Sequence, residues 1–187
     1  GMIGSHAAGV IGALVAGYGG YLTGYPPLQL ALLEAGVWFP LTVLGLTEAT
    51  RAKFAPRWAV LTGWALGMSW MAGHPQTSYF LTLLSVAYFA YRVWAGRLGW
   101  RVWIIGTGIF GLISIGVVAV TLFPGAEYLI QTSRAEFGFE AKDGGFPYRD
   151  ALQMIFPHAF SLFSPLYLGV TGLGLAVMAA YGRVRGV

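Results

Sequence analysis

Cysteine is absent from the sequence, and charged residues are scarce for a chain of 187 residues. Without cysteine there is no disulfide, no thiolate metal site and no cysteine nucleophile. Charged side chains make up 10 % of the chain, whereas soluble domains carry roughly 25 %. The 11 basic and 7 acidic residues are too few to solvate a water-soluble globule of this size. Disorder is excluded as well, because the sequence is not polar enough to remain unfolded.

Hydrophobic residues make up 57 % of the chain and gather in long runs. A bilayer core of about 30 Å is crossed by about 20 apolar residues in a helix. The runs that approach this length cover residues 2–23, 28–46, 58–73, 76–94, 102–123 and 166–181. The sequence therefore predicts an all-α protein, a polytopic transmembrane helix bundle of about six spans.

Most of the basic residues lie between these runs, and their placement predicts an orientation. They form three groups: Arg51, Lys53 and Arg57; Arg92, Arg97 and Arg101; Arg183 and Arg185. Six spans bring all three groups to one side, which the positive-inside rule assigns to the cytoplasm. We therefore expect a multi-pass protein of the bacterial inner membrane with both termini in the cytoplasm. A nucleic-acid partner is not expected, since the basic residues form no single solvated patch.

The whole chain, residues 1–187, is expected to form one transmembrane domain. Residues 1–123 supply five spans, and Pro124 is expected to end the fifth. Residues 124–164 form an extracytoplasmic segment in which two amphipathic stretches predict short interfacial helices. Residues 165–187 supply the last span and a cytoplasmic tail. Because the chain opens with glycine rather than methionine and enters an apolar run almost at once, we expect it to be an interior piece of a longer protein.

The turn between the third and fourth runs holds two candidate binding residues, His74 and Gln76. The helix that begins there leaves backbone N–H groups free, and such a helix start favours an anion such as phosphate. His74 is suited to bind phosphate, to donate a proton or to ligate a metal. The alternative is a tight turn in which a polar side chain caps the helix, and the spacing alone leaves both interpretations open.

Two acidic residues and one arginine are further candidates. Glu127 and Arg134 are seven residues apart, which is about two helical turns, so they share a helix face. At the membrane edge this pair is suited to hold an anionic lipid headgroup, or the two side chains satisfy each other. Glu34 lies inside the second run, where a carboxylate normally faces a cavity or a partner. A shallow interfacial helix would instead leave Glu34 in water.

The remaining candidates favour structural roles. The spacing of Gly63 and Gly67 predicts close helix packing. His6 is expected in the core and His158 at the membrane interface. The three histidines are scattered without helical pairing, which does not favour haem or chlorophyll, so no metal site is predicted and no cofactor is assigned. The sequence also lacks the GxxxxGK, HExxH and EF-hand motifs.

Four elements of the chain, taken in order, resemble those of the bacterial YfhO-type membrane proteins. They are Trp38-Phe39-Pro40-Leu41 after Tyr25-Pro26-Pro27, the Ala72-Gly73-His74-Pro75-Gln76-Thr77 turn, Phe123-Pro124 with Glu127-Tyr128 and Ser133-Arg134, and Phe156-Pro157 with Tyr167-Leu168-Gly169. The turn is the most specific element, and together the four span nearly the whole chain. The adjacency of Ser133 and Arg134 departs from the spacing of the family.

The resemblance implies a polytopic glycosyltransferase-like protein of the GT-C class. Such proteins transfer sugar from a polyprenyl-phosphate donor to a lipid or envelope acceptor on the extracytoplasmic side of the membrane. By this resemblance, His74, Gln76 and Arg134 would contact the phosphate of the donor, with Glu127 at the same site. The implied partners are membrane lipids and the polyprenyl-phosphate sugar donor.

One departure from the class leaves open whether the chain is an enzyme. The class carries its catalytic carboxylate in the first extracytoplasmic loop, but the corresponding residues 24–27 contain no acid. Either the catalytic part precedes this chain in a longer protein or the chain is inactive, so no catalytic residue is assigned. The alternative function is a non-catalytic accessory subunit of a photosynthetic or respiratory membrane complex, which packs on pigments, lipids and other membrane subunits. A transporter ranks third, because Glu34 and broken helices permit it but no paired half-repeats are visible.

Overall fold

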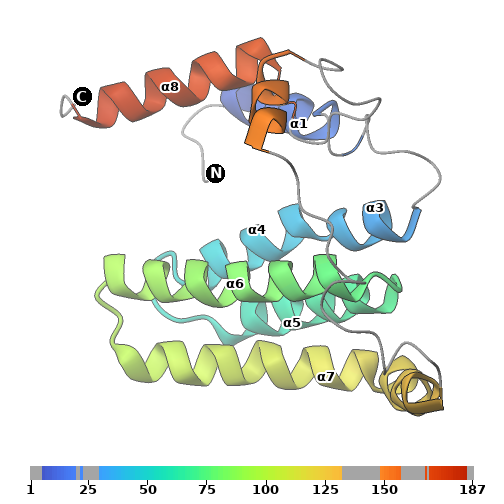
Figure 1. The fold of residues 1–187 in the computed structure, drawn as a ribbon. Coiled ribbons are helices and arrows are strands. Elements are labelled where there is room, and N and C mark those ends of the chain that lie inside the picture. Colours follow the sequence, from blue (N-terminus) through green and yellow to red (C-terminus); the bar gives the residue numbers. More distant parts are fainter. Residues whose placement is uncertain are drawn as a thin grey trace. The chain divides into compact units, whose positions relative to one another are not determined.

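The structure is a computed structural model, which describes residues 6–19, 22, 30–131, 148–156, 167 and 169–184 (Figure 1). Its elements are α1 (His6–Gly17), α3 (Leu30–Gly36), α4 (Phe39–Ala49), α5 (Pro56–Met71), α6 (Pro75–Ala95), α7 (Trp100–Gln131), the 3-10 helix η4 (Tyr148–Met154) and α8 (Val170–Val184). The described residues contain no strand, which confirms the all-α prediction. By its internal contacts the chain divides into two units, residues 1–30 with 143–187 and residues 31–142, and each is described by itself.

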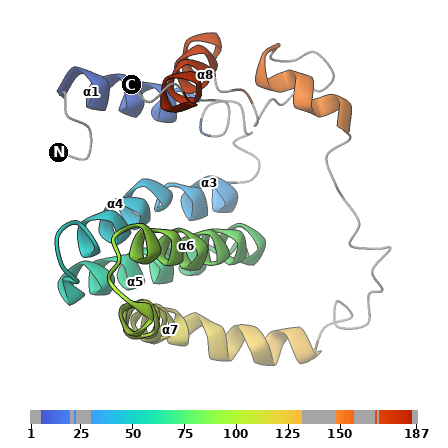
Figure 2. The same ribbon diagram turned by 90° about the vertical axis from the view of Figure 1, so that its left-hand side faces the viewer.

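Four helices, α4 to α7, pack against one another in the unit of residues 31–142 (Figures 1 and 2). α5 contacts α4, α6 and α7, and its contact with α7 is close at two glycines. A Cβ added to Gly63 would lie 2.6 Å from the carbonyl oxygen of Phe110, and a Cβ added to Gly67 would lie 2.5 Å from the Cβ of Val117. The glycine pair therefore lets the two backbones approach closely, as its spacing predicts.

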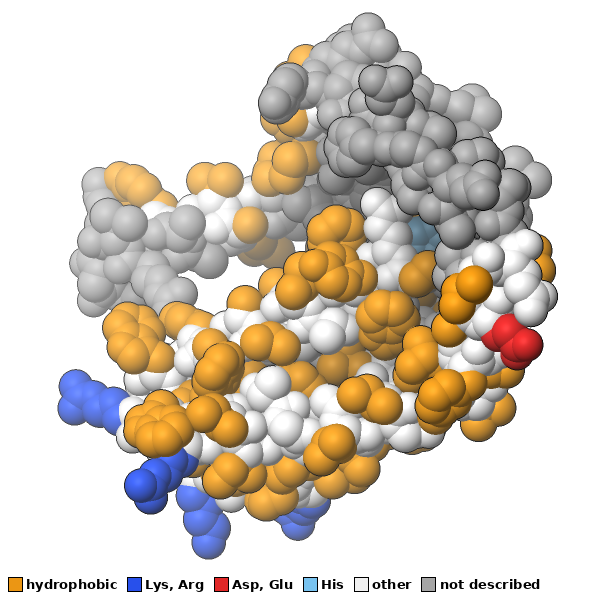
Figure 3. Space-filling model, turned by 60° about the horizontal axis from the view of Figure 1, so that its bottom comes forward, with side chains coloured by type: hydrophobic (Ala, Val, Ile, Leu, Met, Phe, Trp, Pro, Cys, Tyr) orange, Lys and Arg blue, Asp and Glu red, His pale blue; other side chains and the backbone are white. Residues whose placement is uncertain are grey.

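The interior of this unit holds many small and hydroxyl-bearing side chains beside a cluster around Phe89 and Phe110. These buried small and polar residues include Ala35, Ala49, Ala59, Ala65, Thr42, Thr62, Ser69, Ser78 and Ser85. The hydroxyls of Thr42 and Thr62 each donate to a carbonyl one turn back in their own helix, at 2.9 Å. Large apolar side chains cover much of the outer face in Figure 3. Small and hydroxyl-bearing residues inside, with large apolar residues outside, are typical of helices that pack in lipid.

Two segments are long and apolar enough to cross a membrane, judged by length and composition. They are Leu30–Ala49, which α3 and α4 share, and Trp100–Tyr128 of α7. The sequence also carries no Asp, Glu, Lys or Arg in residues 58–91 or in residues 102–126. Large exposed apolar surfaces are rare on soluble monomers and mark contact with a membrane or a partner.

The second predicted run is divided into two helices by a short turn. α3 ends at Gly36 and α4 begins at Phe39. Pro40 lies in the first turn of α4, where its missing N–H leaves no bond unmade. In one continuous helix, the ring of Pro40 would clash with the carbonyl of Gly36. The ring of Trp38 in the turn packs edge-on against Trp64 of α5, with centroids 5.1 Å apart, and so holds the turn on the bundle.

α7 continues through Pro124 to Gln131, so the expectation that Pro124 ends this helix is wrong. Proline has no N–H, and its ring presses on the carbonyl four residues earlier, which bends a helix rather than ending it when the turns on both sides hold. Figures 1 and 2 show such a bend in the second half of α7. Residues 124–131 thus belong to α7 rather than to a separate segment over residues 124–164.

The rest of the predicted extracytoplasmic segment is described only in part. Tyr148–Met154 form η4, a short 3-10 helix within the predicted segment. Residues 132–147 and 157–166 lie outside the described residues. In the same unit α8 approaches α1 closely, because a Cβ added to Gly172 would lie 2.8 Å from Cγ1 of Val15.

Candidate functional site

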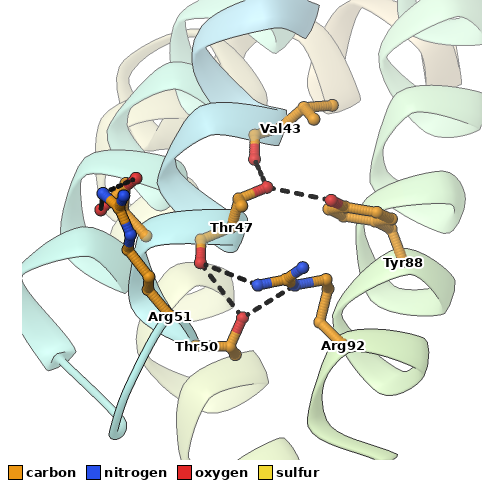
Figure 4. Close-up of polar contacts among 7 residues, drawn as sticks. Val43, Thr47, Thr50, Arg51, Tyr88 and Arg92 are labelled. Atoms are coloured by element: carbon orange, nitrogen blue, oxygen red, sulfur yellow. Dashed lines mark hydrogen bonds and ion pairs between the residues drawn. The ribbon is translucent and has the colours of Figure 1, made fainter. Parts of the chain in front are cut away.

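The unit of residues 31–142 has one basic end, which Figure 3 shows as a gathering of Lys and Arg side chains. Arg92, in the last turn of α6, donates through Nε to the hydroxyl of Thr50 at 3.1 Å and through Nη2 to the carbonyl of Thr47 at 3.4 Å (Figure 4). This contact joins the loop after α4 to the end of α6. It confirms that two predicted basic groups lie at one end, namely Arg51, Lys53 and Arg57 with Arg92, Arg97 and Arg101.

The hydrogen bonds of Arg92 stabilise the contact between the end of α6 and the end of α4. Its guanidinium lies against the carbonyls that end α4, where the helix dipole favours a cation. Thr47 donates its hydroxyl to its own helix at 2.7 Å and accepts from the hydroxyl of Tyr88 at 2.9 Å. Arg51, beside this cluster in Figure 4, pairs with Glu48 at 3.1 Å. Both arginines therefore have partners within the chain.

His74 is the N-cap of α6, at the end of that helix away from Arg92. Its Nδ1 accepts from the N–H of Thr77 at 3.2 Å and lies 2.8 Å from the hydroxyl oxygen of Thr77. An Nδ1 that accepts a backbone N–H carries no proton, so in the neutral ring the proton is on Nε2. The capping interpretation is confirmed, and the Nε2–H donor lies outside the cap.

Gln76 follows His74 in the first turn of α6, and its side chain is exposed. Pro75 has no N–H, and the imidazole of His74 takes the N–H of Thr77. The N–H of Gln76 is the first-turn donor for which the described residues supply no partner. An anion at this helix start would therefore meet one backbone N–H, the Gln76 amide and the Nε2–H of His74, which are fewer backbone donors than a free helix start offers.

Two buried serines hold the same end of the unit together. Ser69 of α5 donates to the carbonyl of Ala35 in α3 at 2.9 Å, and Ser78 of α6 donates to the carbonyl of Ser69 at 2.7 Å. Both side chains are fully buried, with their oxygens 3.0 Å apart. We call this pair the serine clamp. Because Ser78 lies one turn after His74, the clamp fixes the helix start that presents His74.

The serine clamp is not predicted from the sequence, because a serine within an apolar run carries no functional signal by itself. One signal for it exists in the sequence. Both serines lie among small residues and aromatic residues with no charge nearby, and hydroxyl groups in such helices commonly bond across helix interfaces.

The described residues show no contact between His74 and the other candidates. Glu127 is exposed near the end of α7, beyond Pro124. Arg134 lies outside the described residues, so its pairing with Glu127 stays a prediction. Glu34 is exposed on α3, next to the turn before α4. This exposure fits the interfacial interpretation of Glu34 better than a carboxylate that faces a closed cavity.

Among the described residues, the other histidines form no second candidate binding site. His6 is exposed at the start of α1, so the expectation that it lies in the core is wrong. His158 lies outside the described residues. In the described part of the chain, no group of three or more His, Asp or Glu residues is placed to hold a metal ion.

No family model, curated protein or solved structure matches the chain. The chemistry of the site therefore rests on its own geometry. The first turn of α6 offers neutral donors, on His74 and Gln76, to an anionic oxygen. No carboxylate contacts these donors among the described residues, so no acceptor in this part of the chain competes with an anion for them.

Proposed function

We propose that this chain is a multi-pass protein of the bacterial inner membrane, with about six spans and with its basic end and both termini in the cytoplasm. The interior of small and hydroxyl-bearing residues and the two apolar segments support membrane insertion. The six basic residues at one end support the orientation through the positive-inside rule. Alkaline carbonate extraction of membranes tests the insertion: the protein is expected in the pellet, and its release into the supernatant would contradict the proposal.

We propose further that the chain is part of a GT-C-like glycosyltransferase, which binds the phosphate of a polyprenyl-phosphate sugar donor at the start of α6. The sugar then passes to a lipid or envelope acceptor. The observation that carries this proposal is the geometry of His74, which caps α6 through Nδ1 and keeps its proton on Nε2. A donor beside a helix N-terminus binds a phosphate oxygen well. In the proposed orientation the start of α6 faces the extracytoplasmic side.

The other candidates take supporting roles in this proposal. Gln76 supplies an amide donor from the first turn of α6. Glu127 follows the bend in α7, and we propose that Glu127 and Arg134 flank the carrier headgroup. No catalytic carboxylate is assigned within this chain, because the loop at residues 24–27 contains no acid.

A binding measurement separates the cap from the ligand contact. In His74→Ser the serine hydroxyl keeps an N-cap but loses the Nε2–H, whereas His74→Ala loses both. We expect both variants to bind a polyprenyl phosphate in nanodiscs about 10- to 100-fold more weakly, because a hydrogen bond to a charged oxygen contributes about 1.5–3 kcal/mol. Only His74→Ala is expected to lose thermal stability. An uncharged polyprenol is the control ligand, and unchanged affinity in His74→Ser would remove His74 from the site.

Sugar transfer tests the activity itself. Membranes that contain the full-length gene product are supplied with a labelled polyprenyl-phosphate sugar, and transfer to the lipid fraction is measured. We expect His74→Ala to abolish transfer while leaving expression intact. Full transfer by this variant would show that the start of α6 is not the donor site.

The second candidate function is an accessory subunit of a photosynthetic or respiratory membrane complex. The outer face of α7 favours it, because large apolar side chains such as Leu112 and Val120 are 72 % and 76 % exposed. Partner helices as well as lipid would cover such a face. Purification in mild detergent decides between the two functions. Pigment-binding or respiratory chains that co-purify in a fixed ratio would favour the subunit.

A further inference from the structure

A cavity of about 740 Å³ lies at the basic end of the unit, between the end of α6 and the start of α7. Three tryptophans and one arginine line it, namely Trp94, Trp100, Trp103 and Arg97, with Ala90 and Val93 along its apolar side. We call it the tryptophan cavity. It is separate from the start of α6, where His74 lies at the opposite end of the same helix.

The backbone at Arg97 is strained. Its φ of 53° lies in the left-handed region, which side-chain-bearing residues rarely adopt. The N–H of Leu98 bonds to the carbonyl of Val93 at 3.0 Å, and the N–H of Arg97 bonds to the carbonyl of Trp94 at 3.1 Å. These two bonds form the Schellman motif that ends a helix, and its left-handed position strongly favours glycine. An arginine at this position destabilises the folded chain relative to glycine. This strain indicates that Arg97 has a role other than stabilising the fold.

Arg97 also differs from the other arginines at this end in having no partner. Arg51 pairs with Glu48, and Arg92 bonds to Thr50. The guanidinium groups of Arg57 and Arg101 lie over tryptophan rings, at 5.8 Å from the centroid of Trp58 and 5.7 Å from that of Trp100. For Arg97 the described residues supply neither an acceptor nor a ring, although it lines the tryptophan cavity.

Trp103 contributes its ring to the cavity wall, whereas its Nε1–H is buried away from the cavity and has no acceptor among the described residues. The charged donor that the cavity offers to a ligand is therefore the guanidinium group of Arg97. This donor favours a ligand that carries oxygen acceptors and a negative charge.

The basic side chains around the cavity favour an anionic ligand. The described residues of this end include six basic side chains and one acid, Glu48, which Arg51 engages. The apolar side of the cavity, at Ala90 and Val93, continues onto exposed apolar side chains of α6 and α7. A ligand that matches both features has an anionic head and an apolar body.

We propose that the tryptophan cavity binds the phosphodiester headgroup of an anionic phospholipid in the cytoplasmic leaflet. Arg97 pairs with the phosphate, the rings of Trp94, Trp100 and Trp103 surround the headgroup, and the acyl chains lie along α6 and α7. Tryptophan and arginine at the headgroup level are the side chains that membrane interfaces favour. This inference rests on the proposed membrane insertion but not on the proposed sugar transfer.

The test uses Arg97→Gly, which introduces the residue that the left-handed backbone conformation favours. The whole chain in detergent is titrated with phosphatidylglycerol or with phosphatidylcholine, and bound lipid is counted by native mass spectrometry. We expect wild-type protein to bind phosphatidylglycerol more tightly than phosphatidylcholine. Arg97→Gly is expected to bind phosphatidylglycerol about tenfold more weakly than wild type does, with no change in its binding of phosphatidylcholine. The Tm of Arg97→Gly is expected to rise by about 2–4 °C, because the strain is relieved. Lys53→Gln, which removes one exposed charge outside the cavity, is the matched control and should bind as wild type does.

Each contrary result overturns the proposal in its own way. Equal binding of the two lipids by wild-type protein, or an unchanged preference in Arg97→Gly, would show that Arg97 selects no headgroup. An equal loss in Lys53→Gln would show a general charge effect. Displacement of the lipid by glycerol 1-phosphate at comparable concentration would show that a free phosphate is the ligand. Failure of the membrane proposal is seen separately, in carbonate extraction, because this titration is done in detergent.

Discussion

Replacing Gly63 by alanine places a methyl group directly into the contact between α5 and α7. The added Cβ would lie 2.6 Å from the carbonyl oxygen of Phe110, 2.9 Å from its Cα and 2.8 Å from the Cβ of Ile113. Comfortable separations between such atoms are about 3.5–4 Å. Because two of these neighbours are backbone atoms, no side-chain rotation relieves the overlap. The helices must move apart by about 1 Å, which also opens the contact at Gly67.

The size of the effect follows from two opposing terms. Overpacking in a close-packed interior costs about 1–3 kcal/mol. The substitution also recovers helix propensity, because alanine is better than glycine by about 0.8–1.0 kcal/mol. We therefore expect Gly63→Ala to lower the free energy of unfolding by up to about 2 kcal/mol. The matched control is Gly108→Ala on α7, where an added Cβ meets nothing within 4 Å and no loss is expected.

The assay is unfolding of the purified protein in detergent by increasing fractions of sodium dodecyl sulfate. Loss of helix by circular dichroism and the change of tryptophan fluorescence report the midpoint. Gly63→Ala should unfold at a lower fraction than wild type, and Gly108→Ala at the same or a higher fraction. Equal midpoints for the two variants would refute the inference that α5 and α7 meet backbone to backbone at Gly63.

Three further changes test the other contacts. Arg92→Met, measured by the same unfolding assay, should lose about 1–2 kcal/mol, because the carbonyl of Thr47 loses its cation at the end of α4; Arg92→Lys should recover part of the loss, and full stability in the methionine variant would contradict this role. Ser69→Ala should cost about 0.6–1 kcal/mol, since the carbonyl of Ala35 loses its donor; a more stable variant would argue against the serine clamp. An impermeant amine reagent should spare Lys53 in intact cells and modify it after permeabilisation, and labelling of Lys53 in intact cells would reverse the proposed orientation.

The sequence predicts the paired helices α5 and α6 well, because each is an apolar run bounded by proline and glycine, with a single arginine near one end. The predicted runs 58–73 and 76–94 differ by at most two residues from Pro56–Met71 and Pro75–Ala95. The common end of the first two basic groups also follows from counting helices between them. These features depend on composition along the chain, which a single sequence shows directly.

Features that depend on the response of a helix to one residue were harder to predict. Pro40 and Pro124 are both prolines in apolar runs, yet the chain breaks before Pro40 and only bends at Pro124. The difference lies in the neighbours, because Trp38 of the break packs on Trp64 while helical turns hold both sides of Pro124. The left-handed backbone of Arg97 was unforeseen for a similar reason, since glycines on both sides, Gly96 and Gly99, are the usual residues for that conformation.

The candidate site was predicted in location but not in detail. The turn before α6 follows from the sequence, and His74 and Gln76 lie in it as expected. The number of free N–H groups was overestimated, because the His74 ring occupies that of Thr77. Such a contact depends on the rotamer of one side chain, which spacing does not reveal. Binding of phosphate at this turn stays a prediction.

The bend in α7 bears on how deep that helix would sit. Pro124 deprives the carbonyl of Val120 of the amide that normally caps it, and a bare carbonyl is poorly tolerated in hydrocarbon. From Trp100 to Val120 a helix rises about 30 Å, which is the thickness of the apolar slab. In the proposed orientation, the proline thus stands where the helix first reaches water again. In that placement, the proline would oppose movement of α7 along the membrane normal, because the uncapped carbonyl of Val120 would have to enter the hydrocarbon.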